Sequence, residues 1–69
     1  MRWGILGTGG VAYAMADALA QVDGAHVVAV GSRAPVRARH FSSHHSVRHW
    51  YGTYEELVAD ADVDVVYVA

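Results

Sequence analysis

The chain has 69 residues, a formal net charge of −2 at pH 7, one proline and no cysteine. Such a length allows one small domain, which buries only about 60% of its extended-chain surface and here has no disulfide or cysteine-bound metal to reinforce it. The near-neutral pI and the scattered arginines argue against a nucleic-acid partner. No apolar run is long enough to span a membrane, and glycines interrupt the N-terminal apolar stretch, which argues against a secretory signal. We therefore expect a cytoplasmic protein.

The first predicted element is a strand at Trp3–Leu6 that leads into a glycine-rich turn, in the sequence RWGILGTGGVA. Gly7 would permit the tight bend, Gly9 would let the backbone approach a pyrophosphate, and Ala12 takes the third small position, where helix and strand pack closely. Backbone N–H groups at the start of the next helix would face the phosphates. The predicted cofactor-binding turn therefore comprises Gly7, Thr8, Gly9, Gly10, Val11 and Ala12. Similar turns also occur in βα units that bind no ligand.

A helix is predicted after this turn, because apolar residues recur there at helical spacing. The expected buried residues are Val11, Met15, Ala18, Leu19 and Val22. Asp23-Gly24 ends this helix with a pair suited to a left-handed turn. A second apolar strand follows at His26–Val30, which completes a βαβ unit.

The end of the second strand indicates which cofactor is preferred. An NAD site usually places an acidic residue there, whereas this chain has Ser32 followed by Arg33. Arg33 could bind a 2′-phosphate and stack on adenine, with Arg37 as a second candidate. We therefore predict NADP, with NAD possible, and a contact of roughly 1.5–3 kcal/mol would give about a ten- to hundredfold preference. The alternative is that both arginines are solvated surface residues.

The second half of the chain continues the alternation of helices and strands. Pro35 begins a predicted helix that runs to about His44, and a short strand is predicted at about Val47–Trp50. Thr53 and Glu56 have capping-box spacing. These two residues predict a short helix at Tyr54–Ala59, and the valine-rich stretch Val63–Ala69 suits a strand buried on both faces.

The predicted fold class is α/β, a Rossmann-like parallel sheet with the order β-α-β-α-β-α-β and the spatial order 3-2-1-4. Only half of a doubly wound NAD(P)-binding domain is then present, and ligands in such sheets bind beyond the carboxyl ends of the strands. We expect residues 1–69 to be the N-terminal part of a dinucleotide-binding domain, with much of one sheet face apolar and exposed.

Five histidines raise the question of a metal site. His40 and His44 stand one helical turn apart, and His45 and His49 follow. Because no third ligand is evident, we expect no metal and interpret these residues as a polar surface patch. His26 is expected to pack or cap, and Tyr67 is expected to be a buried strand residue rather than a catalytic one.

The blocks MRWGILGTGGVA, VVAVGSRAPVRARHF and YGTYEELVADADVDVVYVA resemble the start of the Gfo/Idh/MocA family of NAD(P)-dependent oxidoreductases. The resemblance covers the whole chain. It implies hydride transfer between a nicotinamide cofactor and a sugar, cyclitol or dihydrodiol-type hydroxyl carbon, with a C-terminal substrate domain that is absent here and often forms a homo-oligomer interface. Family members typically use a lysine in a Glu-Lys-Pro motif, and this chain has no lysine, so no catalytic residue is assigned.

Two hypotheses remain open. The first is the cofactor-binding part of an oxidoreductase acting on a small-molecule substrate. The second is a non-catalytic nucleotide-sensing or interaction module, or an inactive remnant, that retained the fold.

Overall fold

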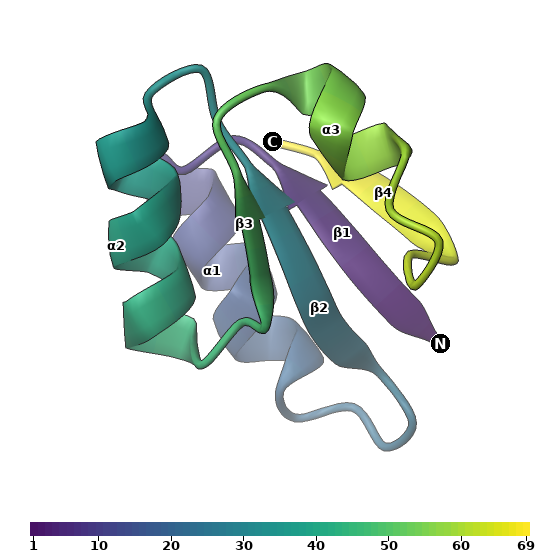
Figure 1. The fold of residues 1–69 in the computed structure, drawn as a ribbon. Helices are drawn as coiled ribbons and strands as arrows, with labels where there is room; N and C mark the ends of the chain where they lie inside the picture. Colours follow the sequence, from purple (N-terminus) through teal and green to yellow (C-terminus); the bar gives the residue numbers. More distant parts are fainter.

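Four parallel strands form a single sheet in the computed structural model, which describes residues 1–69. The strands are β1 (Arg2–Leu6), β2 (His26–Gly31), β3 (His49–Tyr51) and β4 (Val65–Val68). Their spatial order is β3-β2-β1-β4 (Figure 1), and every neighbouring pair is parallel. The predicted fold class and strand order are confirmed.

Helices cover both faces of the sheet unequally (Figure 1). The longer helices α1 (Gly10–Leu19) and α2 (Pro35–His45) pack on one face, and the short helix α3 (Tyr54–Val58) packs on the other. Pro35 occupies the first turn of α2, and the C-cap residue after the helix, Ser46, has a left-handed φ of 55°. None of the helices combines the length and apolar character needed to cross a membrane.

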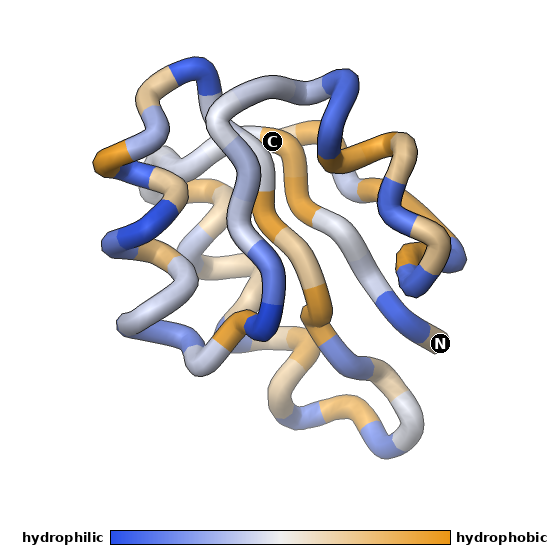
Figure 2. The backbone as a smooth tube through the Cα atoms, viewed as in Figure 1, coloured by the Kyte–Doolittle hydropathy of each residue, from blue (hydrophilic) through white to orange (hydrophobic).

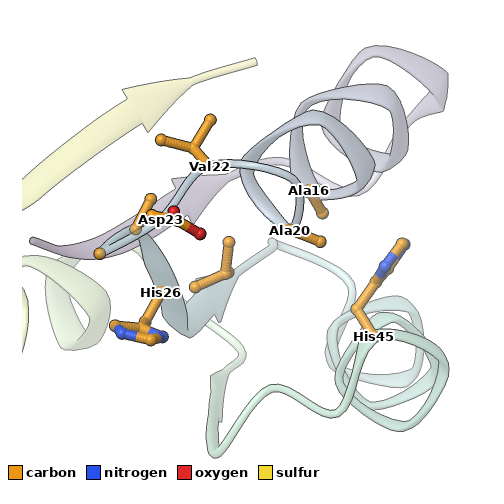
Figure 3. A pocket seen from close by; sticks show the side chains of 9 residues that line it. Ala16, Ala20, Val22, Asp23, His26 and His45 are labelled. Atoms are coloured by element: carbon orange, nitrogen blue, oxygen red, sulfur yellow. The ribbon is translucent and has the colours of Figure 1, made fainter.

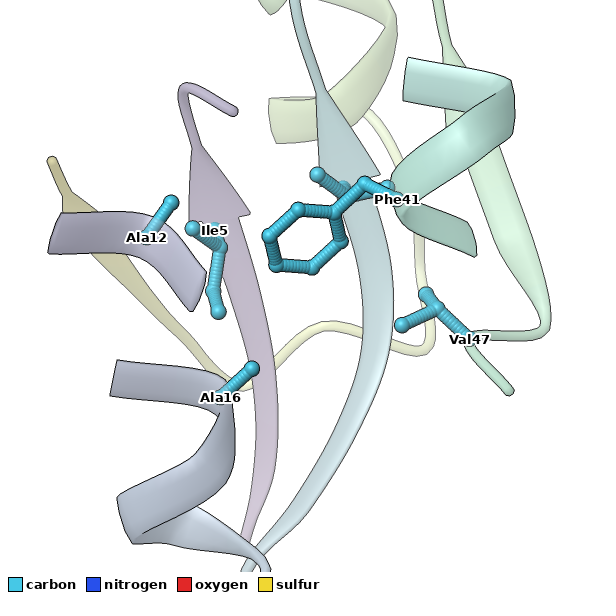
Figure 4. Close-up of a cluster of buried hydrophobic side chains, with 6 residues drawn as sticks. Ile5, Ala12, Ala16, Phe41 and Val47 are labelled. Carbon is cyan, nitrogen blue, oxygen red and sulfur yellow. The ribbon is translucent and has the colours of Figure 1, made fainter. Parts of the chain in front are cut away.

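The main core lies between the sheet and the two longer helices (Figure 4). It contains Ile5, Ala12, Ala16, Val30, Phe41 and Val47. The Phe41 ring packs edge-on against Tyr13, with ring centroids 4.6 Å apart. This contact joins α2 to α1, so the two helices and the sheet share one cluster.

On the opposite face of the sheet, the close packing of α3 depends on glycines within the strands. A Cβ at Gly4 would lie 3.1 Å from Val63 Cγ1, and a Cβ at Gly31 would lie 3.1 Å from Leu57 Cβ. Because both positions lack side chains, α3 approaches the sheet closely enough to bury Leu57 completely. Apolar residues occur in β1, β2 and β4, whereas β3 is polar to neutral (Figure 2).

The predicted buried face of α1 was largely wrong. The helix ends at Leu19 rather than Val22, and its buried residues are Ala12, Ala16 and Leu19. Val11 and Val22 are 61% and 54% exposed. Alanine side chains permit a closer contact with the sheet than valines would, and this tertiary contact selected the face among several apolar alternatives.

The last two strands also differ from their predictions. The third strand is His49–Tyr51 rather than Val47–Trp50. The predicted strand at Val63–Ala69 is shorter, at Val65–Val68, and is half-buried rather than buried on both faces. Val68 is 71% exposed, and β4 lies at the edge of the sheet, where it pairs with β1.

The predicted cap of α3 is present. Thr53 Oγ1 accepts a hydrogen bond from the Glu56 amide at 3.2 Å, and the same hydroxyl donates to Glu56 Oε1 at 2.9 Å. In the expected capping box the carboxylate bonds to the Thr53 amide, so this is a variant of that arrangement. The hydroxyl still satisfies one of the free N–H groups at the start of the helix.

A hydrogen-bond network around Asp60 ties β3 to the loop between α3 and β4. Asp60 Oδ2 accepts hydrogen bonds from Tyr51 Oη and His49 Nδ1, each at 2.7 Å, and Oδ1 accepts the Asp62 amide at 2.8 Å. The Tyr51 bond is the main cause that lowers the pKa of Asp60 below its ordinary value. The same bond raises the pKa of Tyr51 to about 12.

We predict that Asp60→Asn removes a pH-dependent part of the stability. Because the pKa of Asp60 is lowered on folding, its contribution is complete above about pH 4 and is lost as pH falls through the folded-state pKa. The variant should lose about 1–2 kcal/mol at neutral pH and a smaller amount in acid. Urea unfolding from neutral pH down to below about pH 4 measures the free energy of unfolding of wild type and variant at each pH. Asp23→Asn, at an exposed carboxylate, is the control, and an equal loss in the two variants would contradict the prediction.

Candidate functional site

The glycine turn begins at Gly7, where β1 ends at the carboxyl edge of the sheet. Gly7 has a φ of +113°, and its N–H donates to the Gly31 carbonyl at 2.8 Å. A Cβ at this position would lie 3.4 Å from the Ala69 Cβ and carbonyl oxygen. The positive φ therefore favours glycine here, whereas an added Cβ would make only ordinary van der Waals contact with Ala69.

The start of α1 is open and offers backbone donors. Gly9 is the N-cap residue, no side chain caps the helix, and no acidic residue lies in its first turn. A Cβ added at Gly9 or Gly10 would meet nothing within 4 Å. Free N–H groups at the positive end of a helix, beside open space, form a suitable site for a phosphate. Ala12 is completely buried, as its predicted packing role requires.

Ser32 connects this turn to the end of β2. Its side chain is among the buried polar groups, with the residue 6% exposed. The hydroxyl accepts the Ala34 amide at 3.1 Å and lies 3.4 Å from Thr8 Oγ1. The position that carries an acidic residue in NAD sites is therefore neutral and held beside the glycine turn.

The two predicted arginines lie in different surroundings. The Arg33 guanidinium carbon lies 5.7 Å from the centre of the Tyr54 ring. Arg37 instead lines a groove of about 360 Å³ with Thr8, Tyr13, Val36 and His40. Both arginines are exposed, and neither forms an ion pair with a carboxylate. The structure thus brings Arg37 into one groove with Thr8 of the turn, while Arg33 lies against Tyr54 of α3.

Sequence reasoning missed three residues of this groove, Tyr13, Val36 and His40. Tyr13 follows the small position at Ala12 by one residue, and His40 follows Arg37 by three. Residues three apart on a helix share a face, so this spacing could have placed His40 beside Arg37. The sequence alone did not show that this face of α2 lies next to the glycine turn.

A second hollow of about 390 Å³ lies at the other end of the sheet (Figure 3). It is lined by α1, the following turn and the start of β2, including Ala16, Val22, Asp23 and His26, and by His45 at the end of α2. His45 Nε2 is buried there without a hydrogen-bond partner. Ligands of parallel α/β sheets bind beyond the carboxyl ends of the strands, so the glycine turn and not this hollow is the candidate site.

The histidines are divided among different surroundings. The His40 and His44 rings stack with centroids 6.4 Å apart, whereas His45 packs 4.7 Å from the Phe41 ring. His49 lies in the Asp60 network, where ligand atoms of His49, Asp60 and Asp62 lie within 4.8 Å of one another. Asp60 already accepts three hydrogen bonds in that network. Its oxygens therefore have hydrogen-bond partners without a metal ion.

A parallel sheet whose first strand runs through a glycine turn into an open helix N-terminus defines a dinucleotide-binding α/β domain. The family described as "Oxidoreductase family, NAD-binding Rossmann fold" matches residues 1–69, and the chain belongs to this family, Gfo/Idh/MocA. The resemblance noted in the sequence is confirmed.

Relatives and solved structures agree with this assignment. A trans-1,2-dihydrobenzene-1,2-diol dehydrogenase from Danio rerio is 40% identical over 70 residues, covering 99% of this chain and 21% of that protein. A variant 3-ketoreductase from Actinomadura kijaniata, in complex with TDP-benzene and NADP, has a TM-score of 0.88 and 32% identity, covering 99% of this chain and 22% of its own. A myo-inositol dehydrogenase from Lactobacillus casei, in complex with NAD(H) and myo-inositol, has a TM-score of 0.90 and 30% identity, covering 100% of this chain and 21% of its own.

The glycines of the turn predict contrasting effects on stability. Gly7→Ala should destabilise the fold by about 1–3 kcal/mol, because its backbone conformation is unfavourable for a side chain. Gly9→Ala should change stability by less than about 1 kcal/mol, because its φ of −81° is ordinary and the added methyl meets no atom. Thermal unfolding of the two variants measures the difference. Equal losses would contradict the proposed geometry of the turn.

Proposed function

We propose that this chain is the NADP-binding part of an oxidoreductase that transfers a hydride between the nicotinamide and a hydroxyl carbon of a sugar, cyclitol or dihydrodiol. The observation that carries the proposal is the open glycine turn at the carboxyl edge of the sheet, next to a groove that contains Thr8 and Arg37. Relatives named as dihydrodiol and inositol dehydrogenases support the substrate class.

Each part of the proposed site has a distinct role. The N–H groups after Gly9 bind the pyrophosphate, and the missing Cβ atoms at Gly9 and Gly10 leave room for it. Ser32 leaves the ribose position without a negative charge, so it does not repel a 2′-phosphate. Arg37, with Arg33 at the rim, attracts that phosphate. The cofactor, when bound, supplies or accepts the hydride.

The group that moves the proton of the substrate hydroxyl is not assigned to this chain. Residues 1–69 contain no lysine. The hydrogen bonds of Asp60 with His49 and Tyr51 connect β3 to the loop before β4 and lie outside the groove. The chain spans 21% of the length of the dihydrodiol dehydrogenase it matches. We therefore propose that a further domain of a longer protein supplies catalysis, substrate contacts and a homo-oligomer interface, and that this protein acts in the cytoplasm.

The alternative is a nucleotide-sensing or interaction module without catalysis. The absence of an assigned catalytic residue is compatible with both functions. Cofactor turnover by the longer protein that contains this chain separates them, because a sensing module would bind the same nucleotide without oxidising or reducing it.

Calorimetric titration of NADP and NAD into the 69-residue chain, checked by circular dichroism, tests the proposed cofactor. NADP should bind about tenfold more tightly than NAD, because an arginine–phosphate contact contributes roughly 1.5 kcal/mol even when partly exposed. Gly9→Val should weaken both cofactors, since its side chain would occupy the space for the pyrophosphate. A folded chain that binds neither cofactor would contradict the proposal.

The roles of the arginines predict a selective loss. Arg37→Gln and Arg33→Ala should each weaken NADP more than NAD, with the larger effect at Arg37, which lines the groove with Thr8. Arg48→Gln is the matched control, because Arg48 is exposed and lines a hollow with Arg2 and His26 at the amino-terminal end of the sheet. Equal loss of NADP and NAD in both arginine variants would show that neither residue reads the 2′-phosphate.

A further inference from the structure

The groove beside the glycine turn contains a second ionisable base. Its walls are Thr8 of the turn, Tyr13 of α1, and Val36, Arg37 and His40 of α2, around a volume of about 360 Å³. Arg37 and His40 are three residues apart, which places them on one face of the helix. Both side chains therefore face the same space that opens onto Thr8.

The charged groups around His40 are all basic. On α2, His40 shares a neighbouring hollow with Arg39 and stacks on His44 with an angle of 15° between the rings. From α1, only Tyr13 lines the groove. The α1 carboxylate, Asp17, lies 3.6 Å from His45 instead. No carboxylate on the surrounding elements is therefore positioned to neutralise a protonated His40.

We propose that His40 is a second specificity-determining residue, which together with Arg37 binds the 2′-phosphate of NADP and makes the preference for NADP increase as the pH falls. This inference rests on the proposed function. Histidine is the side chain whose charge ordinarily changes between about pH 5 and 8. A protonated His40 adds a charge-assisted contact to the phosphate, whereas NAD carries a hydroxyl at the same position and gains nothing comparable.

The test uses the two adenosine halves that differ only in this phosphate, 2′,5′-ADP and 5′-AMP. Their affinities for the nitrogen-labelled 69-residue chain are measured by NMR titration at about pH 6 and about pH 8. The ratio of the two affinities isolates the 2′-phosphate. Comparing wild type with His40→Gln at the same pH removes the titration of the phosphate itself, and His26→Gln, at the far end of β2, is the control.

At about pH 6 the preference for 2′,5′-ADP should be about two- to fivefold greater in wild type and His26→Gln than in His40→Gln, as expected for an exposed charge pair. At about pH 8 the three proteins should converge. As an independent measure, 2′,5′-ADP, but not 5′-AMP, should move the titration of the His40 ring resonances in wild type to higher pH.

Equal preferences in wild type and His40→Gln at the lower pH, or an unchanged His40 titration with 2′,5′-ADP, would overturn the role of His40. These results would leave the proposed function intact if the amides of Gly7–Val11 still respond to both nucleotides. If neither nucleotide perturbs those amides, the proposed function fails as well, so the two failures are distinguishable.

Discussion

Three backbone segments meet at Gly7, and the position of the candidate site depends on their close approach. The Gly7 amide donates to the Gly31 carbonyl at the end of β2, and the Ala69 amide, after β4, donates to the carbonyl of the preceding residue, Leu6. The positive φ at Gly7 then turns the chain from β1 into α1. Because of this turn, the N-terminus of α1 lies at the carboxyl edge of the sheet, where its free N–H groups can act together.

Small residues extend this close packing to both faces of the sheet. On one face, Ala12 and Ala16 let α1 pack on Ile5. On the other, Gly4 and Gly31 make room for Leu57 of α3. Small residues also form the glycine turn, so the start of α1 presents backbone N–H groups rather than side chains. The affinity for phosphates therefore comes from these N–H groups. Discrimination between NADP and NAD then depends on the few side chains beside the turn, Arg33, Arg37 and His40.

The sequence predicted the arrangement of elements because alternating strands and helices impose a parallel sheet with crossovers of one hand. The turn at Gly7 and the cap at Thr53 were also predictable, since each depends on a short segment. The buried face of α1 was not, because apolar residues lie on several faces of that helix and only contact with the sheet selects among them. The burial of β4 was overestimated, because a valine-rich composition favours a strand but does not show how much of each of its faces another element covers.

The side chains proposed to contact the 2′-phosphate were also difficult to predict from the sequence. The sequence favoured Arg33 over Arg37 as the residue that binds a 2′-phosphate. The structure instead places Arg33 against Tyr54 of α3, which lies far along the chain. The inclusion of His40 depends on α2 lying beside the glycine turn. Such contacts arise from tertiary packing and not from local pattern, so only a structure could bring these residues together.

Binding of a dinucleotide at the glycine turn can be mapped by the amide chemical-shift changes that NADP causes. The affected amides should cluster at Gly7–Val11, at Ser32 and along the groove face of α2 from Arg37 to His40. Changes confined to the hollow around Asp23 and His26, or no saturable change in a folded chain, would contradict it.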